Sequence, residues 1–494
     1  MTSTATTDFD VLVIGAGISG IAAAYHLKKH RPSATFAILD GRTEIGGTWS
    51  LFNYPGIRSD SDMPSFGFGF KPWTDKKSIA DAHIILDYLN ETVDENGIGA
   101  HVRFGQKVLA ADFDSAAARW TVTARDVETG DLTEYTANFV YSGTGYYNYE
   151  AGYTPEFDGI ESFGGRVVHP QHWPADLDYT GKRVVVIGSG ATAVTVVPNM
   201  AKTAGHVTML QRSPSYVFSL PAEDAIANTL NKLVGPDRAY PIIRRKNIAL
   251  NRGVFKAAMR FPAAVRKLLI ADVKRRLPKG YDVDTHFSPA YNPWEQRLCM
   301  VPNGDLFTAI SAGTASVVTD HIDHFTETGI ALKSGRHLDA DIVVTATGLD
   351  LLPFGGITLS VDGTDVDVAD TVVYKAMMLS GVPNFVFAIG YTNIAWTLKV
   401  DLICEHMIRI LDHMDQHGHH TVTPTPADPI IERGPLLDMS SGYVQRKIAT
   451  FPKVGTSGPW GLTMAYEDDV VRLRHGAVTD DALVFSADVP ALAG

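Results

Sequence analysis

The fold of this chain is decided by the stretch Val11-Leu12-Val13-Ile14-Gly15-Ala16-Gly17-Ile18-Ser19-Gly20. Its apolar run predicts a buried parallel strand, and the glycines that follow fit the pattern G-x-G-x-x-G. In this pattern the first glycine makes a tight turn, the second lets a pyrophosphate approach the backbone, and the third lets the next helix pack closely on the strand. Free N–H groups at the start of that helix then face the phosphates. The stretch predicts a dinucleotide-binding unit that uses Gly15, Gly17, Ser19 and Gly20.

An acidic residue further along selects the type of nucleotide. The next predicted strand, Thr35 to Leu39, ends in Asp40, twenty residues after Gly20. A carboxylate at this distance accepts hydrogen bonds from the hydroxyls of a ribose that carries no phosphate. Asp40 is therefore predicted to bind the cofactor, and it favours FAD or NAD over NADP.

A second copy of the pattern begins near residue 182. The apolar run 184–187 leads into Gly188-Ser189-Gly190-Ala191-Thr192-Ala193, the form G-x-G-x-x-A. Its second predicted strand, Val207 to Leu210, is followed by Gln211-Arg212-Ser213, with no acidic residue at the ribose position. A guanidinium and a hydroxyl there suit a 2′-phosphate, which favours NADPH. The residues predicted to bind NADPH are Gly188, Ser189, Gly190, Ala191, Thr192, Ala193, Arg212 and Ser213.

Bulk composition is compatible with these units and excludes other classes. The 494 residues exceed one ordinary core, and 45% hydrophobic with 20% charged residues is typical of a soluble globular protein. The net charge of -12 disfavours nucleic acid or an anionic membrane as a general partner. No signal-peptide pattern is present at the start, and the two cysteines, Cys299 and Cys404, predict reduced thiols rather than a disulfide framework. We expect a cytoplasmic α/β protein with two Rossmann-like dinucleotide-binding domains.

Two segments have compositions of their own. Residues 222–290 show helical periodicity and predict a helical insertion in the second unit, and 238–279 hold thirteen basic residues against one acid, Asp272. We interpret this segment as the solvated face of a helical subdomain, with a peripheral membrane or anionic partner as the other interpretation. His413, His417, His419 and His420 are interpreted as surface histidines, and no metal site is predicted.

A chain with one FAD-type site and one NADPH-type site is predicted to be a flavoprotein oxidoreductase. Cys299 and Cys404 lack the Cys-x-x-Cys spacing of a disulfide reductase, so dioxygen is the favoured electron acceptor. Residues 163–174, Phe163 to Pro174, fill every defined position of F-x-G-x-x-x-H-x-x-x-W-[PD]. This motif resembles the fingerprint of type I Baeyer–Villiger monooxygenases, which are class B flavoprotein monooxygenases. A second signature of that family is similar to Gly46-Gly47-Thr48-Trp49, Tyr54-Pro55-Gly56 and Asp60.

The segment 291–298, together with 390–393 and Trp396, resembles the ethionamide-activating subgroup of that family. Better-known members carry their catalytic arginine in a Gly-Thr-Lys-Arg stretch, which this chain lacks. The resemblance makes Arg297 the candidate catalytic arginine and Asp60 its partner.

The resemblance implies an activity: NADPH reduces FAD, dioxygen forms a peroxyflavin, and one oxygen is inserted next to a carbonyl to give an ester or lactone. Arg297 would hold the anionic oxygen, because its charge is permanent and its donors are planar. Arg58 and Ser59 are expected to contact the nicotinamide half. His169 and Trp173 are expected to couple domain motion to cofactor position. The remaining residues expected to bind cofactor are Gly47, Thr48, Trp49, Asp60 and Val108.

The family's architecture implies three segments. These are an FAD-binding part at 1–146, an NADP-binding domain at 147–384 that includes the linker fingerprint 163–174, and a second FAD-binding part at 385–494. The expected substrates are a ketone or a thioether, with dioxygen as co-substrate. The alternatives are a flavin-containing monooxygenase that acts mainly on sulfur or nitrogen, and an NADPH:flavin reductase that does not oxygenate.

Overall fold

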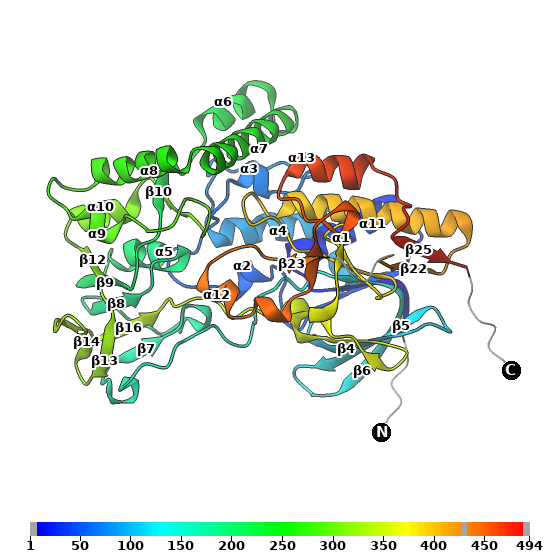
Figure 1. Cartoon of the computed structure of the whole chain (residues 1–494), viewed down its shortest axis with the longest axis horizontal. Helices are drawn as coiled ribbons and strands as arrows, with labels where there is room; N and C mark the ends of the chain where they lie inside the picture. The colour runs from blue at the N-terminus through cyan, green and yellow to red at the C-terminus, as the bar shows by residue number, and fades with distance from the viewer. Residues whose placement is uncertain (1–6, 427–431, 488–494) are drawn as a thin grey trace.

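The computed structural model describes residues 7–426 and 432–487. The predicted α/β fold with two Rossmann-like units is confirmed. Two separate sheets occupy different parts of the molecule (Figure 1), and each has a glycine turn at the end of a central parallel strand. The helical segment in green lies along one edge of the molecule.

The first sheet begins with the strand that the sequence predicts. Its strands from the N-terminal third are β1 (Thr7–Ile14), β2 (Phe36–Leu39), β3 (Val102–Arg103), β4 (Gln106–Asp114), β5 (Arg119–Asp126) and β6 (Leu132–Ser142). β1 pairs in parallel with β2 and β6, whereas β4, β5 and β6 pair antiparallel. Val11 and Val13 pack on one side of the sheet, and Leu12 and Ile14 pack on the other. Burial on both faces explains why β1 reads as a continuous apolar run.

Three helices supply the core on the Val11 side. They are α1 (Ile18–His30), α4 (Ala82–Glu95) and α11 (Thr397–His417). The small residues Ala22, Ala23 and Ala24 on α1 are fully buried, so this helix lies close to the strands. Close packing of α1 brings its N-terminus to the end of β1, where the predicted phosphate site lies.

The chain returns to the first sheet earlier than residue 385. β17 (Thr358–Val361) pairs with β4, and β18 (Thr364–Asp365) pairs with β17. β21 (Phe385–Phe387) then pairs with β6. The predicted boundary at 384 assigns β17 to the NADP-binding segment, although β17 pairs with a strand of the first sheet. β17 is a short strand on the outer side of β4, and four residues of mixed burial produce little periodic signal.

The second sheet is parallel throughout, in the order β12-β9-β8-β16-β7. Its strands are β7 (Arg166–Val168), β8 (Arg183–Ile187), β9 (His206–Gln211), β12 (Ala315–Thr319) and β16 (Ile342–Thr345). α5 (Ala191–Met200) and α10 (Asp305–Ser311) pack against it. The fingerprint 163–174 is not only a linker, because its residues 166–168 form the edge strand β7.

The helical insertion lies between β10 (Val217–Leu220) and β11 (Cys299–Pro302), which pair with each other in parallel. It contains α6 (Ala225–Val234), α7 (Pro236–Arg260), α8 (Pro262–Arg276) and α9 (Val283–His286), as the periodicity of 222–290 predicts. No helix of the described ranges combines the length and the hydropathy needed to cross a membrane.

The remaining elements are short. They are α2 (Thr48–Leu51), α3 (Met63–Phe66), β13 (Ile322–Thr326), β14 (Gly329–Leu332), β15 (His337–Asp339), β19 (Val373–Tyr374), β20 (Met378–Leu379), β22 (Thr421–Pro424), β23 (Arg433–Pro435), α12 (Gly442–Gln445), β24 (Lys453–Gly455), α13 (Tyr466–Asp469) and β25 (Leu483–Ser486).

Candidate active site

The first glycine turn has the geometry that a bound pyrophosphate requires. Gly15 has a φ of +97°, and a Cβ on Gly20 would lie 1.9 Å from the carbonyl oxygen of Gly15. The N-cap of α1 is Gly17, and no side chain caps this end of the helix. Its amide groups and the positive end of its dipole are therefore available to an anion.

Asp40 lies at the end of β2, beside this turn. Its Oδ2 accepts a hydrogen bond from the Ala16 amide at 2.6 Å, and its Oδ1 accepts one from the Arg42 amide at 2.8 Å. Burial raises the pKa of the Asp40 carboxyl, while these two amides act in the opposite direction. Each carboxylate oxygen has a second lone pair, so Asp40 can brace the turn and still accept a ribose hydroxyl. Val108 lies buried in β4, whose first residue, Gln106, donates to the Asp40 carbonyl oxygen at 2.8 Å.

The second signature packs on the first turn. The Gly46 amide donates to the Ala16 carbonyl oxygen at 3.1 Å, and a Cβ on Gly47 would lie 3.1 Å from the Cα of Gly17. Thr48 starts α2, and its side chain lies close to that of Tyr149. Trp49 packs edge-on against Phe66, with ring centroids 5.6 Å apart. The structure thus brings Gly47, Thr48 and Trp49 next to Gly17.

Arg58 and Ser59 have protein partners of their own. The Arg58 guanidinium pairs with Asp305 of α10, with Nη1 and Oδ2 2.6 Å apart, and only 8% of its side chain is exposed. The Ser59 hydroxyl accepts a hydrogen bond from the Ala80 amide at 3.1 Å. These contacts hold the loop that ends at Asp60, and Arg58 connects that loop to the second sheet's helices. The expected contact of both residues with the nicotinamide stays a prediction.

The second glycine turn is closely packed like the first, but it has open space at its second glycine. A Cβ on Gly188 would lie 2.3 Å from the Ala346 carbonyl oxygen, whereas a Cβ on Gly190 would meet no atom within 4 Å. Gly190 is the N-cap of α5, and no side chain caps that helix either. Open space above an uncapped helix start suits a pyrophosphate. The Ser189 hydroxyl donates to the Ser213 carbonyl oxygen at 3.0 Å, which joins the turn to the segment after β9.

Other predicted NADPH residues cluster around this turn. Ala191, Thr192 and Ala193 form the first turn of α5, and the side chain of Tyr54 lies close to that of Thr192. Arg212 and Ser213 are exposed directly after β9. The loop 47–60 therefore runs from the first glycine turn to the second.

Arg297 and Asp60 form an ion pair, although 236 residues lie between them in the sequence. Asp60 raises the pKa of the Arg297 guanidinium further above its usual value, so the arginine carries a permanent charge. Both side chains remain partly exposed, at 39% and 37%. The pair is therefore accessible to a small molecule.

Three tyrosines near Arg297 were missed by sequence reasoning. Tyr443, Tyr146 and Tyr147 lie close enough to Arg297 to interact with its charge. Burial raises the pKa of all three hydroxyls. The position of Tyr146 and Tyr147 just beyond the carboxyl end of β6 was a usable signal, since ligands bind at that edge of such sheets. Tyr443 has no such local signal.

The fingerprint residues contact the segment before them. The Gln171 amide donates to His169 Nδ1 at 3.1 Å, and Gln171 Nε2 donates to the Asn148 carbonyl oxygen at 2.8 Å. A Cβ on Gly152 would lie 2.0 Å from the His169 ring. Trp173 packs against the core of the second sheet. These contacts attach the fingerprint to the stretch that connects the two sheets.

The histidine cluster is separate from this site. The rings of His413 and His417 lie 4.1 Å apart at the end of α11, and Phe485 packs on His413. Within residues 7–426 and 432–487, no group of three or more His, Cys, Asp or Glu side chains could hold a metal ion. Both cysteines are buried and free.

Two uncapped glycine turns, one beside a carboxylate and one beside a free-standing arginine, define an oxidoreductase that uses two dinucleotides. Comparison with known proteins gives the family. A model described as "Flavin-binding monooxygenase-like" matches residues 70–379, and one described as "NAD(P)-binding Rossmann-like domain" matches residues 13–75. The chain is 49% identical over 482 residues to the FAD-containing monooxygenase EthA of Mycobacterium tuberculosis, covering 97% of this chain and 98% of that protein. The chain belongs to the flavin-binding monooxygenase-like family.

Further similar proteins are also monooxygenases. The putative FAD-containing monooxygenase MymA of Mycobacterium tuberculosis is 49% identical over 485 residues, covering 97% of this chain and 98% of its own length. Among solved structures, an oxidised steroid monooxygenase bound to NADP superposes with a TM-score of 0.78 at 21% identity, covering 98% of this chain and all of that one. An open cyclohexanone monooxygenase gives 0.75 at 20% identity, covering 97% of this chain and all of that one. The prediction of a flavoprotein monooxygenase, similar to the ethionamide-activating subgroup, is confirmed.

Proposed function

We propose that this monooxygenase binds FAD at the first glycine turn and NADPH at the second, and that it inserts one atom of dioxygen next to a ketone carbonyl. The observation that carries the proposal is the Arg297–Asp60 ion pair. Asp60 ends the loop 47–60, which runs from the first glycine turn to the second. The relatives include an FAD-containing monooxygenase and a steroid monooxygenase bound to NADP, which supports these two cofactors. Sulfoxidation of thioethers is the second activity that we propose, because the same oxygen can pass to sulfur.

The residues around the first glycine turn bind FAD, and those around the second bind NADPH. The uncapped start of α1 holds the FAD pyrophosphate, and Asp40 holds its ribose. The uncapped start of α5 and the open space at Gly190 hold the NADPH pyrophosphate. The first sheet, including β17 and β21, is the FAD-binding domain, and the second sheet is the NADP-binding domain.

When bound, FAD would supply the electrons that activate dioxygen and so provide the reactive oxygen. Arg297 then acts on the substrate: its planar donors hold negative charge as it develops on the carbonyl oxygen. Asp60 fixes the orientation of those donors by an ionic hydrogen bond. Tyr443 interacts with the charge of Arg297 and would further restrict its rotation. Arg58 and Ser59 shape the loop that carries Asp60. We propose that the edge of this loop at Arg58 would face the nicotinamide.

A substrate panel tests the activity. Purified enzyme with FAD and NADPH is given linear, cyclic and aromatic ketones and thioethers, and products are counted against NADPH and dioxygen consumed. Esters or lactones at one per NADPH support the proposal. Products from amines or thioethers alone would assign the enzyme to the alternative class, and hydrogen peroxide alone would make it a non-oxygenating reductase.

Arg212 is expected to select NADPH over NADH. It is exposed beside the second turn, where a 2′-phosphate would lie. Arg212→Ala should raise the KM for NADPH by about tenfold or more, since a charge-assisted contact to a phosphate contributes roughly 1.5–3 kcal/mol. The KM for NADH should stay nearly constant. Equal changes for both nucleotides would contradict the assignment.

We also propose a cytoplasmic enzyme whose helical insertion contacts an anionic lipid surface. Nine of the sixteen exposed large hydrophobic side chains in the described ranges lie on this insertion: Ile226, Leu233, Val234, Ile242, Leu250, Val254, Met259, Phe261 and Leu268. Nine of the thirteen basic residues of 238–279 are exposed, and the single acid, Asp272, pairs with Arg275 and Arg276. Apolar side chains interleaved with Lys and Arg are typical of helices that lie on membranes.

Co-sedimentation with lipid vesicles measures this contact. The protein should pellet with phosphatidylserine-containing vesicles at low salt and much less with pure phosphatidylcholine vesicles. Leu233→Asp should weaken pelleting, whereas Val471→Asp, at an equally exposed position outside the insertion, should not. Equal pelleting with both vesicle types, or by both variants, would contradict the proposal.

A further inference from the structure

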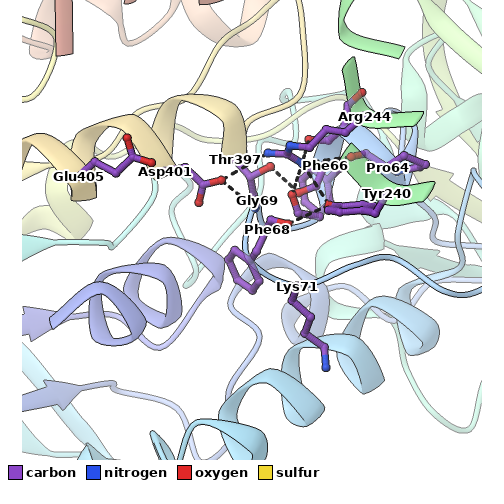
Figure 2. Close-up of polar contacts among 12 residues, drawn as sticks. Pro64, Phe66, Phe68, Gly69, Lys71, Tyr240, Arg244, Thr397, Asp401 and Glu405 are labelled. Carbon is purple, nitrogen blue, oxygen red and sulfur yellow. Dashed lines mark hydrogen bonds and ion pairs between the residues drawn. The ribbon is translucent and has the colours of Figure 1, made fainter. Parts of the chain in front are cut away.

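Helix α7 of the insertion forms several hydrogen bonds to the segment that follows Asp60. Arg244 Nη1 donates to the carbonyl oxygens of Pro64, Ser65 and Gly67 at 3.1, 2.9 and 2.5 Å. The Tyr240 hydroxyl donates to the Phe68 carbonyl oxygen at 2.8 Å, and Figure 2 shows both side chains converging on this loop. Buried carbonyl groups in the last turn of a short helix and just after it have no partner within the helix and need such donors. The loop conformation therefore depends on α7.

The same helix also fixes the start of that segment. Asp62, two residues after Asp60, is the N-cap of α3 and accepts a hydrogen bond from the Ser65 amide at 2.9 Å. Its two carboxylate oxygens accept hydrogen bonds from Asn247 Nδ2 and Asn251 Nδ2, each at 2.8 Å. The carboxylate is thus held from two directions, and little backbone separates it from Asp60.

A different contact of α7 reaches the segment that carries Arg297. The rings of Phe255 and Trp294 meet edge-to-face, with centroids 5.9 Å apart. Trp294 lies three residues before Arg297 and has a φ of +71°, a conformation that bulky residues rarely adopt. Its surroundings must maintain that conformation, and Phe255 is one of the side chains that do so.

These α7 residues share one face of the helix. Positions 240, 244, 247, 251 and 255 are separated by three or four residues, which places their side chains in a single row. Arg297 itself lies two residues before β11, the strand on which the insertion ends. One helix therefore contacts both chain segments that bring the ion pair together.

The row is anchored to the first domain. Arg244 Nη2 pairs with Asp401 of α11 at 3.3 Å, and both side chains are 10% exposed. Asp401 also accepts a hydrogen bond from the Gly69 amide at 2.9 Å, and the Thr397 hydroxyl donates to the Phe66 carbonyl oxygen. A buried guanidinium with this many acceptors is costly to move. α7 cannot shift without breaking these contacts, so its position relative to α11 is fixed.

We propose that α7 is a brace that sets the geometry of the Arg297–Asp60 pair, with Asn251 and Phe255 as positioning residues for the oxygenation step. The contacts that carry this proposal join α7 to the two segments beside the pair rather than to the pair itself. The proposal rests on the proposed function, because it assigns the pair a role in oxygenation. It predicts that the brace matters for the use of dioxygen and not for the delivery of electrons.

The variants are Asn251→Ala and Phe255→Ala, with Leu250→Ala as the matched control, since Leu250 points outward from the same helix and is 61% exposed. Flavin reduction by NADPH, followed by stopped-flow absorbance, should stay within about twofold of wild type. Product formed per NADPH should fall about tenfold, with hydrogen peroxide rising to match, because small misplacement of a catalytic group lowers the rate strongly. Phe255→Tyr, which keeps the ring, should restore most of the product.

A readout that does not use turnover is the labelling of Cys299. This thiol is buried next to the Arg297 segment, where burial raises its pKa to about 12, and its Sγ lies 3.7 Å from the Ser189 carbonyl oxygen. A loosened segment should let maleimide modify Cys299 several-fold faster in Asn251→Ala and Phe255→Ala, as measured by peptide mass spectrometry. Cys404, buried elsewhere beside Tyr141, is the internal control and should not change.

The outcomes separate the two proposals. If wild type makes only hydrogen peroxide with every substrate, the proposed function fails. If wild type oxygenates but both variants match it in product yield and Cys299 labelling, the brace is refuted. Faster labelling of Cys299 and Cys404 together, with parallel losses of reduction and oxygenation, would also refute it, because that result describes general destabilisation.

Discussion

Arg297→Ala should lower the rate of oxygenated product formation by about 100- to 1,000-fold, the range seen when one charge-stabilising donor is removed from an active site. Reduction of the flavin by NADPH should be nearly unchanged, and consumed NADPH should appear as hydrogen peroxide. The two steps differ because they depend on different parts of the structure. Arg297 lies on the segment before β11 and pairs with Asp60, whereas electron delivery depends on the two glycine turns.

Comparison with Arg297→Lys separates charge from geometry. Lysine keeps a positive charge but lacks the planar set of donors, so this variant should retain part of the activity. Asp60→Ala should resemble a milder Arg297→Ala, since the arginine would remain charged but lose its fixed orientation. Stopped-flow absorbance and product analysis on the same samples provide both rates. A loss of flavin reduction in step with oxygenation would contradict the assignment of Arg297 to the oxygenation step.

Gly20→Ala should yield protein that contains almost no FAD. The added methyl carbon would lie 1.9 Å from the Gly15 carbonyl oxygen, far inside contact distance, and that atom belongs to rigid backbone. Either α1 moves away from β1 or the turn rearranges, and both changes remove the pyrophosphate site. The measurement is the ratio of flavin to protein by absorbance after purification, together with the thermal unfolding midpoint.

Gly190→Ala is the control for this prediction, at the second glycine of the other turn. A methyl group there meets no protein atom within 4 Å, so folding and FAD content should be unaffected. The KM for NADPH should rise, because the methyl group would occupy the space through which the pyrophosphate approaches. Normal FAD content in Gly20→Ala would contradict the close packing on which this argument rests.

The residues of the two nucleotide sites could be identified from the sequence because their signals are local. The predicted strand Val207 to Leu210 lies within β9, and the glycine turns follow the predicted strands, since apolar runs and glycines act within a few residues. Asp40 lies at the end of β2 beside the first turn, as its spacing from Gly20 predicts. The Arg297–Asp60 pairing followed from a family resemblance, and composition or periodicity contained no information about it.

Sequence by itself determined the two dinucleotide turns, the family and the helical character of 222–290. Only the tertiary structure decided that β17 joins the first sheet, that Tyr443 borders Arg297, and that α7 connects both segments of the ion pair. Strand and turn signals come from interactions between neighbours in the chain, so they can be read residue by residue. Side chains such as Asn251 and Phe255 look like ordinary helix residues until distant segments pack against them. Contacts between those segments depend on how the two sheets and the insertion assemble, and no local pattern records that assembly.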